Sequence, residues 1–367
     1  MKKILIICGK LCVGGAEKVA YSIGHYADRS KYECHYVVFG DSVGEYEAEL
    51  LKDGSKIFHI PGPGESYTTY WKNLTRLIKE YQYDVVHCHT MFNSGIVLLA
   101  ARLKGVPCRI AHSHSICSST KRPLIKQLYE NAMRFLIKKC ATEYVACGKK
   151  AGEWLYGKKL FQKSGILLLN GIDTVQFTYS EEKRNRIRES YNLKDKFVIG
   201  HVGHLLEVKN QVFLLNMLPK ILAKRPETVL MLIGEGQDRK MLENRIKELN
   251  ILEHVIMTGN VMNVPDYLSA LDVFVFPSLY EGMPLAMLEV QANGLPCVMS
   301  DAVPEDVHLT DLLNIMSLTE PVDEWVEAIV TCERKDAEKY AEELYKKGYD
   351  IKMVVEKMYS LYEKNKG

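Results

Sequence analysis

Short apolar runs recur along the chain, separated by segments whose apolar residues return every three to four positions. Unbroken apolar runs are typical of strands that are covered on both faces, as in parallel sheets joined by helices. The sequence therefore predicts an α/β protein with two doubly wound, Rossmann-like domains. The runs form two series, at 3–8, 34–39, 84–88, 108–112, 143–147 and 166–169, and then at 197–202, 228–233, 255–259, 272–276 and 296–300.

A break separates the two series. Residues 170–196 begin with the turn signal NGID and continue as a charged stretch with few apolar residues, so we place the domain boundary there. The end of the chain is predicted to be an amphipathic helix. Its apolar face consists of Ile351, Val354, Val355, Met358 and Leu361.

Composition adds little about partners but something about location. The chain carries 48 Lys and Arg against 46 Asp and Glu, so we expect no nucleic-acid partner. The 10 cysteines show no C-x-x-C spacing, as in proteins of a reducing compartment. The first apolar run is too short for a signal peptide, and no run approaches the roughly 20 residues of a membrane span. A cytoplasmic protein is expected.

The first candidate for chemistry is the glycine turn after the first predicted strand. Gly14 and Gly15 precede a predicted helix, with Glu17 near its start. Such a turn lets backbone amides approach a phosphate or a hydroxyl group. A glycine that is needed only for the turn explains the pattern equally well, and the turn is not the G-x-G-x-x-G dinucleotide motif.

Two predicted strands end in His-x-His, at His87 and His89 and at His112 and His114. Residues two apart lie on one side of a strand, and the carboxyl ends of parallel strands face the ligand crevice. Hydrogen-bonded histidines and a zinc site both fit this pattern. No nearby acidic residue completes a set of ligands for a hard metal, so we expect no metal.

The most informative stretch is residues 277–301, in which Glu281 and Glu289 flank Gly282 and Pro284. Glycine and proline suit a helix start, where free amides attract a phosphate. Glu289, two turns along, could then bind ribose hydroxyls.

A second strand, glycine turn and helix lies at 201–215 and carries His204 and Lys209 in its loop. Lys209 offers a positive charge to a diphosphate.

Taken in order, these motifs resemble the retaining glycosyltransferases of family 4, most closely bacterial capsular and exopolysaccharide enzymes. The resemblance covers almost the whole chain, and residues 200–301 are its most specific part. It implies the GT-B fold, in which two Rossmann-like domains face each other across a cleft and the last helix returns to the first domain. The acceptor-side domain would be 1–172 with 350–367, and the donor-binding domain 173–349. The motifs are VGGAE, the His-x-His pairs, NGID, GHVG followed by KN, and EGMPLAMLE.

The resemblance also implies roles for individual residues. His114, Glu281 and Lys209 would be catalytic. His204 stands where the family usually has an arginine, and a histidine cannot offer the same two-pronged hydrogen bond. No metal or cofactor is implied, because the nucleotide-sugar is a substrate. The donor-binding residues would be Gly15, His204, Lys209, Gly259, Met262, Gly282, Met283, Pro284, Leu285 and Glu289.

The expected reaction is retaining transfer of a hexose or N-acetylhexosamine from a nucleotide-sugar, a UDP-sugar by resemblance, to a glycan or lipid-linked acceptor. Residues 121–139 are basic and carry one apolar face, which would allow peripheral contact with the anionic inner face of the plasma membrane, although such a face also packs onto a sheet. Three alternatives stay open: a nucleotide-sugar epimerase, a metal-dependent hydrolase that uses the histidine pairs, and a binding module without catalysis.

Overall fold

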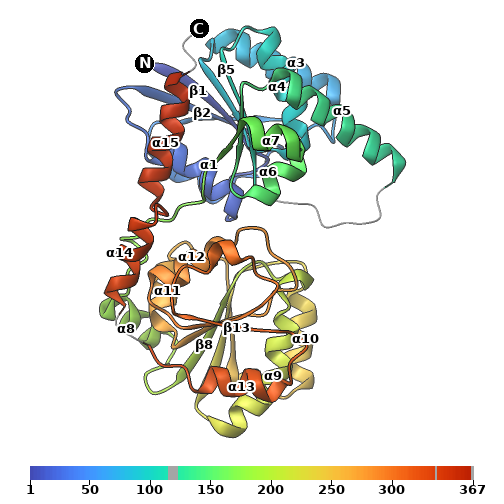
Figure 1. Ribbon diagram of the computed structural model, residues 1–367. Coiled ribbons are helices and arrows are strands. Elements are labelled where there is room, and N and C mark those ends of the chain that lie inside the picture. Colours follow the sequence, from blue (N-terminus) through green and yellow to red (C-terminus); the bar gives the residue numbers. More distant parts are fainter. Residues whose placement is uncertain (115–122, 335–336, 365–367) are drawn as a thin grey trace. The chain divides into compact units, whose positions relative to one another are not determined.

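The computed structural model describes residues 1–114, 123–334 and 337–364 of the chain. The chain divides into two compact units (Figure 1). Unit 1 contains Met1–Gly171 together with the chain from Ile351 onward, and unit 2 contains Ile172–Asp350. Each junction falls one residue away from the boundary expected from the sequence.

Unit 1 is built on a seven-stranded parallel sheet with the strand order β3-β2-β1-β4-β5-β6-β7. The strands are β1 (Lys2–Ile7), β2 (Tyr32–Phe39), β3 (Lys56–Ile60), β4 (Val85–Cys88), β5 (Cys108–Ser113), β6 (Glu143–Ala146) and β7 (Gly165–Leu167). The helices are α1 (Gly15–His25), α2 (Glu47–Lys52), α3 (Tyr67–Tyr81), α4 (Ser94–Leu103), α5 (Leu124–Cys140), α6 (Lys149–Tyr156), α7 (Lys158–Ser164) and α15 (Ile351–Lys364), with a 3-10 turn, η1, at Met91–Asn93.

Strand β1 shows why the strands of unit 1 read as continuous apolar runs. Ile4 and Ile6 belong to one buried cluster, whereas Leu5 and Ile7 belong to another. Successive side chains of a strand point to opposite faces, so both faces of the sheet are covered. The first cluster also contains Val354 of α15, which shows that the last helix packs into unit 1.

Unit 2 contains a six-stranded parallel sheet in the order β10-β9-β8-β11-β12-β13. Its strands are β8 (Phe197–Val202), β9 (Thr228–Ile233), β10 (Val255–Gly259), β11 (Val273–Phe276), β12 (Cys297–Ser300) and β13 (Leu313–Met316). Its helices are α8 (Glu181–Ser190), α9 (Gln211–Lys224), α10 (Arg239–Glu248), α11 (Val264–Ala270), α12 (Leu285–Ala292), α13 (Val322–Val330) and α14 (Glu338–Lys346), with 3-10 turns η2 (Glu207–Lys209), η3 (Leu252–His254) and η4 (Glu305–Val307).

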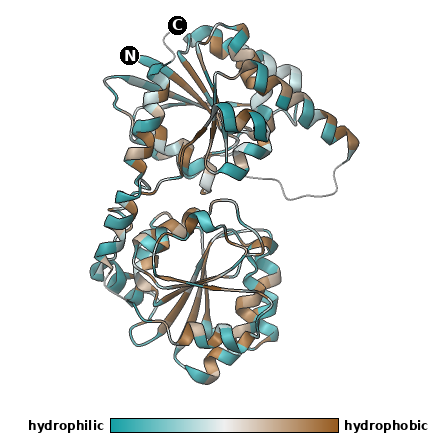
Figure 2. Ribbon diagram, viewed as in Figure 1, coloured by the Kyte–Doolittle hydropathy of each residue, from teal (hydrophilic) through white to brown (hydrophobic). Residues whose placement is uncertain are grey.

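The predicted fold class is confirmed. Both strand orders are doubly wound, with the switch point beside the first strand of each sheet. Hydrophobic residues concentrate in the strands of both units (Figure 2). Every apolar run named above forms a strand, but the edge strands β3 and β13 were not predicted. Each of them leaves part of its length exposed, so neither reads as a continuous apolar run.

The division between the two units falls at the start of the charged stretch, and most of that stretch belongs to unit 2. It forms α8, which is part of unit 2. Arg184 and Arg188 of this helix bind Asp272 at 2.6 and 3.2 Å. The charges therefore hold α8 against the sheet of unit 2, a use of polar residues that the apolar pattern does not reveal.

Candidate active site

Unit 2 brings its candidate residues to the carboxyl edge of the sheet, where ligands bind in doubly wound folds. The turns that follow β8 and β9 touch each other there. A Cβ atom on Gly234, whose φ is +137°, would lie 2.2 Å from the carbonyl oxygen of Gly203. Only glycine therefore fits at position 234. This close contact fixes the path of the loop that carries His204 and Lys209.

Lys209 and Glu281 form an ion pair at this edge. Lys209 Nζ lies 2.6 Å from Glu281 Oε1, and the side chains are only 17% and 9% exposed. The ammonium also lies 5.0 Å from the ring centre of Phe276, the last residue of β11. Two of the predicted catalytic residues are thus brought together on the loops after β8 and β11.

Further hydrogen bonds hold these two loops together. The side-chain amide of Asn210 donates to the carbonyl of Pro277 at 3.1 Å. The backbone N–H of Leu279 donates to the carbonyl of Val208 at 2.8 Å. The ion pair therefore sits on a braced loop pair rather than on two free surface segments, so the cation and the carboxylate are held in place.

Helix α12 begins at Leu285, one residue later than expected, because Pro284 lies at its N-cap with ψ at 113°. Gly282 and Met283 precede the helix. The first amides of a helix have no partner within it and, with the helix dipole, favour an anion. Glu289 is half-buried in the second turn.

Gly259 is the last residue of β10, and Met262 lies in the loop that follows. Gly259 has a φ of +75°, and its carbonyl accepts a hydrogen bond from the N–H of Gly234 at 3.0 Å. Met262 is 54% exposed. The expected base contact from this backbone stays a prediction.

A buried pair behind His204 was missed by the sequence analysis. His201, on β8, places Nδ1 3.0 Å from the carbonyl of Val275, so Nδ1–H donates and Nε2 can accept. Gln211 Nε2 lies 3.4 Å from that Nε2 and donates to the carbonyl of His204 at 2.9 Å. Burial lowers the pKa of His201 to about 4, so the ring is neutral. The His204 side chain is exposed, while its backbone is held from behind.

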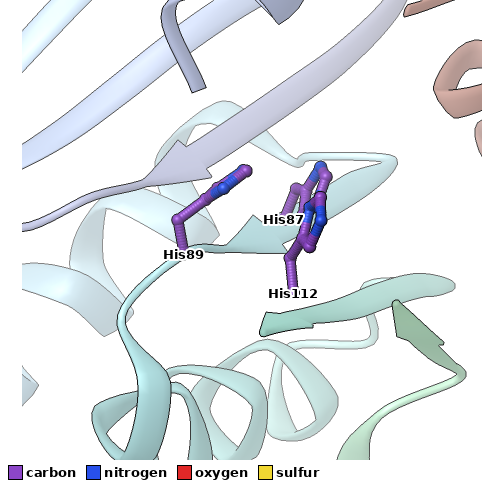
Figure 3. Close-up of side chains that lie close together, drawn as sticks. All are labelled: His87, His89 and His112. Carbon is purple, nitrogen blue, oxygen red and sulfur yellow. The ribbon is translucent and has the colours of Figure 1, made fainter. Parts of the chain in front are cut away.

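Unit 1 gathers the four histidines at the carboxyl ends of the neighbouring strands β4 and β5. The ring centres of His87 and His112 lie 5.3 Å apart, and those of His89 and His114 lie 5.0 Å apart, both pairs being stacked. Figure 3 shows the rings of His87 and His112 face to face with His89 beside them. His87, His89 and His112 are buried, and His114 is half-buried.

These rings bind one another. His89 Nδ1 lies 2.8 Å from His114 Nε2, and His87 Nε2 lies 3.2 Å from His112 Nδ1. Burial lowers the pKa of His87 and of His114 to about 3, and neighbouring rings add to this for His87. The pKa values of His89 and His112 are lowered in the same direction, first by burial and then by the other rings. The four histidines therefore form a neutral cluster.

The cluster contains a group that could hold a metal, because ligand atoms of His87, His89 and His112 lie within 4.8 Å of one another. Neutral imidazoles suit zinc or copper. Each of these rings, however, already uses at least one nitrogen as a hydrogen-bond partner of another ring, whereas Nε2 of His89 and of His112 has no partner among the described residues.

The glycine turn of unit 1 lies at the start of α1. Gly14 is the N-cap, and Gly15, the first residue of the helix, is exposed. A Cβ atom on Gly14 would lie 2.4 Å from a carboxylate oxygen of Glu17, so glycine lets this side chain fold back over the turn. The exposed amide of Gly15 is thus available for a ligand, and its role as a binding residue stays a prediction.

Comparisons with known proteins agree with this arrangement. The family model described as "Glycosyltransferase Family 4" matches residues 13–176, and that described as "Glycosyl transferases group 1" matches residues 183–350. EpsF of Bacillus subtilis, which is named as a glycosyltransferase, is 33% identical over 98% of this chain and 96% of its own length. A galactosyltransferase of Escherichia coli, named for transfer from UDP-Gal to GlcNAc-diphosphoundecaprenol, is 32% identical over 62% of this chain and 60% of its own.

Among solved structures, HepE of Anabaena in complex with UDP-glucose superposes with a TM-score of 0.82 at 19% identity, over 99% of this chain and 100% of that one. The fold is GT-B. The chain belongs to glycosyltransferase family 4, and it is a glycosyltransferase of this retaining family rather than an epimerase or a hydrolase.

Proposed function

We propose that this enzyme transfers a hexose or N-acetylhexosamine from a UDP-sugar to a glycan or lipid-linked acceptor in the synthesis of a surface polysaccharide. The part of this proposal that concerns the sugar donor rests on the ion pair of Lys209 and Glu281, which is held between two hydrogen-bonded loops beside the start of α12. A cation and free helix amides at one sheet edge suit a diphosphate. The relative named for UDP-Gal and a diphosphoundecaprenol acceptor supports the choice of substrates.

Each donor-site residue has a distinct proposed part. Lys209 neutralises charge on the leaving diphosphate, and Glu281 lies beside it near the transferred sugar. The backbone N–H groups of Gly282, Met283 and Leu285 bind phosphate oxygens, whereas Pro284, which has no N–H, lies at the helix start. Glu289 accepts hydrogen bonds from the ribose hydroxyls, and Gly259 and Met262 contact the base through their backbone. His204 binds the diphosphate through one ring nitrogen, at the position where the family usually has an arginine.

Unit 1 would then be the acceptor-side domain and unit 2 the donor-binding domain. His114 would lie near the reacting sugar, and the amide of Gly15 would approach the phosphates or the acceptor. No metal takes part in this proposal, because Lys209 and the helix amides supply the positive charge that a cation supplies in other phosphate sites.

Donor preference can be tested by thermal shift and by slow hydrolysis, read by mass spectrometry, with UDP-glucose, UDP-galactose, UDP-N-acetylglucosamine and GDP-mannose. We expect one UDP-sugar to bind and turn over in the wild type. Lys209→Ala should abolish the binding shift. Lys220→Ala is a matched control, because Lys220 forms an ion pair with Asp323 at 2.8 Å on the exposed surface of the same unit. Equal behaviour of the two variants would place the donor elsewhere.

We further propose that the enzyme works at the anionic inner face of the plasma membrane and contacts it through α5. The start of this helix exposes Leu124, Ile125 and Leu128 by 76%, 83% and 70%, and Phe135 is exposed by 59%. At 100° per residue these four side chains lie on one face of the helix. The helix buries Met133 and Ile137 on another face, so packing onto unit 1 does not account for the exposed residues.

Lys138 and Lys139 lie on or beside this apolar face and Lys126 lies on the opposite side of the helix, while Lys121 and Arg122, also expected to take part, lie outside the described residues. Exposed apolar side chains with nearby cations suit an anionic lipid surface. Within the described part of the chain, no helix is long and apolar enough to span a bilayer.

Sedimentation with phosphatidylglycerol vesicles tests this contact. Binding should be salt-sensitive and should be lost when Leu124, Ile125 and Leu128 are replaced by serine. Leu252→Ser removes a comparably exposed leucine, at 66%, from unit 2 and should leave binding intact. No binding at low salt, or equal binding by both variants, would reject α5 as the contact surface.

A further inference from the structure

Helix α15 contributes a side chain to the histidine cluster. The hydroxyl of Tyr362 lies 2.7 Å from Nδ1 of His87, and Tyr362 is 1% exposed. The next link is the contact of His87 Nε2 with His112 Nδ1 at 3.2 Å. Three groups from three elements of unit 1 thus form one hydrogen-bonded chain, in the order Tyr362, His87 and His112.

The direction of the hydrogens in this chain follows from counting donors and acceptors. If Tyr362 donates to His87 Nδ1, then His87 donates from Nε2 to His112 Nδ1, and His112 carries its hydrogen on Nε2. One buried donor, at His112 Nε2, is then left unmatched. In the opposite direction, both the Tyr362 hydroxyl hydrogen and the lone pair of His112 Nε2 are unmatched. Each unmatched buried group costs free energy, so the first direction is favoured.

Among the described residues, the buried nitrogens without a hydrogen-bond partner include His112 Nε2. In the favoured direction this atom is an N–H donor, and an oxygen atom is its natural partner. The His112 ring lies 4.1 Å, centre to centre, from His114, the residue proposed to lie near the reacting sugar.

We propose that Tyr362 and His87 are positioning residues for glycosyl transfer, which hold His112 in the tautomer whose Nε2–H binds a hydroxyl oxygen of the sugar. The proposal rests on the proposed part of the histidine cluster in the active site. It joins the last helix of the chain to the chemistry, so α15 has a use beyond packing.

The same count of donors and acceptors explains why this cluster favours a hydrogen-bonded chain over a bound metal. A metal ligand needs a free lone pair. In the favoured direction the lone pair of His87 accepts from Tyr362, and that of His112 accepts from His87. A metal that used both rings would have to take these lone pairs, or reverse the tautomers, and would break the hydrogen bond of Tyr362 to His87 in either case.

Nitrogen-15 NMR of histidine side chains in the whole protein at pH 7.5 reads the tautomers directly. We expect His87 and His112 both to be neutral with the hydrogen on Nε2. Tyr362→Phe should remove this preference at His87. Tyr359→Phe is the matched control, because the hydroxyl of Tyr359, on the same helix, donates to the carbonyl of Ile23 at 2.5 Å instead. If His87 of the wild type carried its hydrogen on Nδ1, the proposed direction of the hydrogen-bonded chain would be wrong.

Kinetics test the consequence for catalysis, with the sugar donor that turns over in the hydrolysis test proposed above. Tyr362→Phe should lower kcat by about tenfold, the scale of one buried hydrogen bond, with little change in the donor KM. His87→Gln, whose amide can still donate to His112, should retain more activity than His87→Leu. Equal kcat values for Tyr362→Phe and Tyr359→Phe would refute the positioning role. Because the binding test on Lys209 concerns unit 2 alone, it separates this failure from failure of the donor site.

Discussion

Four neutral, buried histidines should make unit 1 unusually sensitive to mild acid. The pKa of His87 and of His114 is lowered to about 3 by burial, and those of His89 and His112 are lowered too. Unfolding restores an ordinary value near 6.5. Below that pH these histidines bind protons in the unfolded chain but not in the folded one. The free energy of unfolding therefore falls as the pH falls from 6.5 toward the folded pKa values.

The magnitude follows from the same numbers. Each such histidine destabilises the fold by roughly 1.4 kcal/mol for every pH unit below 6.5, or about 2 kcal/mol at pH 5. For His87 and His114 together this is about 4 kcal/mol, a large share of the stability of a typical domain. In the described part of unit 2, His201 is the buried histidine whose pKa is lowered in this way, so the loss there should be about 2 kcal/mol. Unit 1 should therefore lose more stability than unit 2 as the pH falls to 5.

Tryptophan fluorescence can resolve the two units in the intact chain. Trp71 and Trp154 are in unit 1, and the third tryptophan, Trp325, is buried in unit 2. Trp325→Phe leaves a reporter of unit 1 alone, and replacing Trp71 and Trp154 together leaves a reporter of unit 2. Urea unfolding at intervals from pH 8 to 5 then gives the free energy of each unit.

Single replacements should change the slope in a predictable way. His89→Gln should flatten the pH dependence of unit 1 by about one proton, or about 1.4 kcal/mol per pH unit, whatever its effect on stability at pH 8. His201→Gln should leave the slope of unit 1 unchanged, because His201 belongs to unit 2. If unit 1 lost less than about 2 kcal/mol between pH 7 and 5, the rings would not be held neutral in the folded state and the reasoning would fail.

Three further predictions concern the donor site. Lys209→Ala and Glu281→Gln should each lower turnover at least about tenfold, because both residues act on charge around the leaving diphosphate. Glu289→Gln should mainly raise the donor KM. Wild-type kinetics in all three variants would show that the proposed site is wrong. EDTA should leave activity nearly intact, and stoichiometric zinc in the purified protein would contradict this. His204→Ala should weaken donor binding by at most about ten- to a hundredfold, the scale of one charge-assisted hydrogen bond, and His204→Arg should strengthen it; equal donor affinity of wild type and His204→Ala would mean that His204 does not touch the phosphates.

Much of the fold could be predicted because parallel strands buried on both faces leave an unambiguous pattern. The edge strands β3 and β13 escaped, since an exposed edge interrupts that pattern. Helix α8 was not predicted, because its contacts are ionic: Arg184 and Arg188 bind Asp272 more than 80 residues away. Periodicity records which face of an element is apolar, and it carries no information on distant ion pairs.

The histidine cluster shows where prediction of the site from sequence had to end. Two His-x-His motifs on neighbouring strands were enough to expect four rings at one sheet edge, and the rings do gather there. Whether such a cluster holds a metal or a chain of hydrogens depends on what occupies each lone pair. The deciding partner, Tyr362, lies 275 residues from His87 and looks in the sequence like one more apolar residue of an amphipathic helix. Buried rings of this kind stay neutral, and each neutral imidazole carries one N–H hydrogen, on either Nδ1 or Nε2. The burial that should make unit 1 sensitive to acid therefore also lets the hydroxyl of Tyr362 decide the direction of the hydrogen bonds from Tyr362 through His87 to His112.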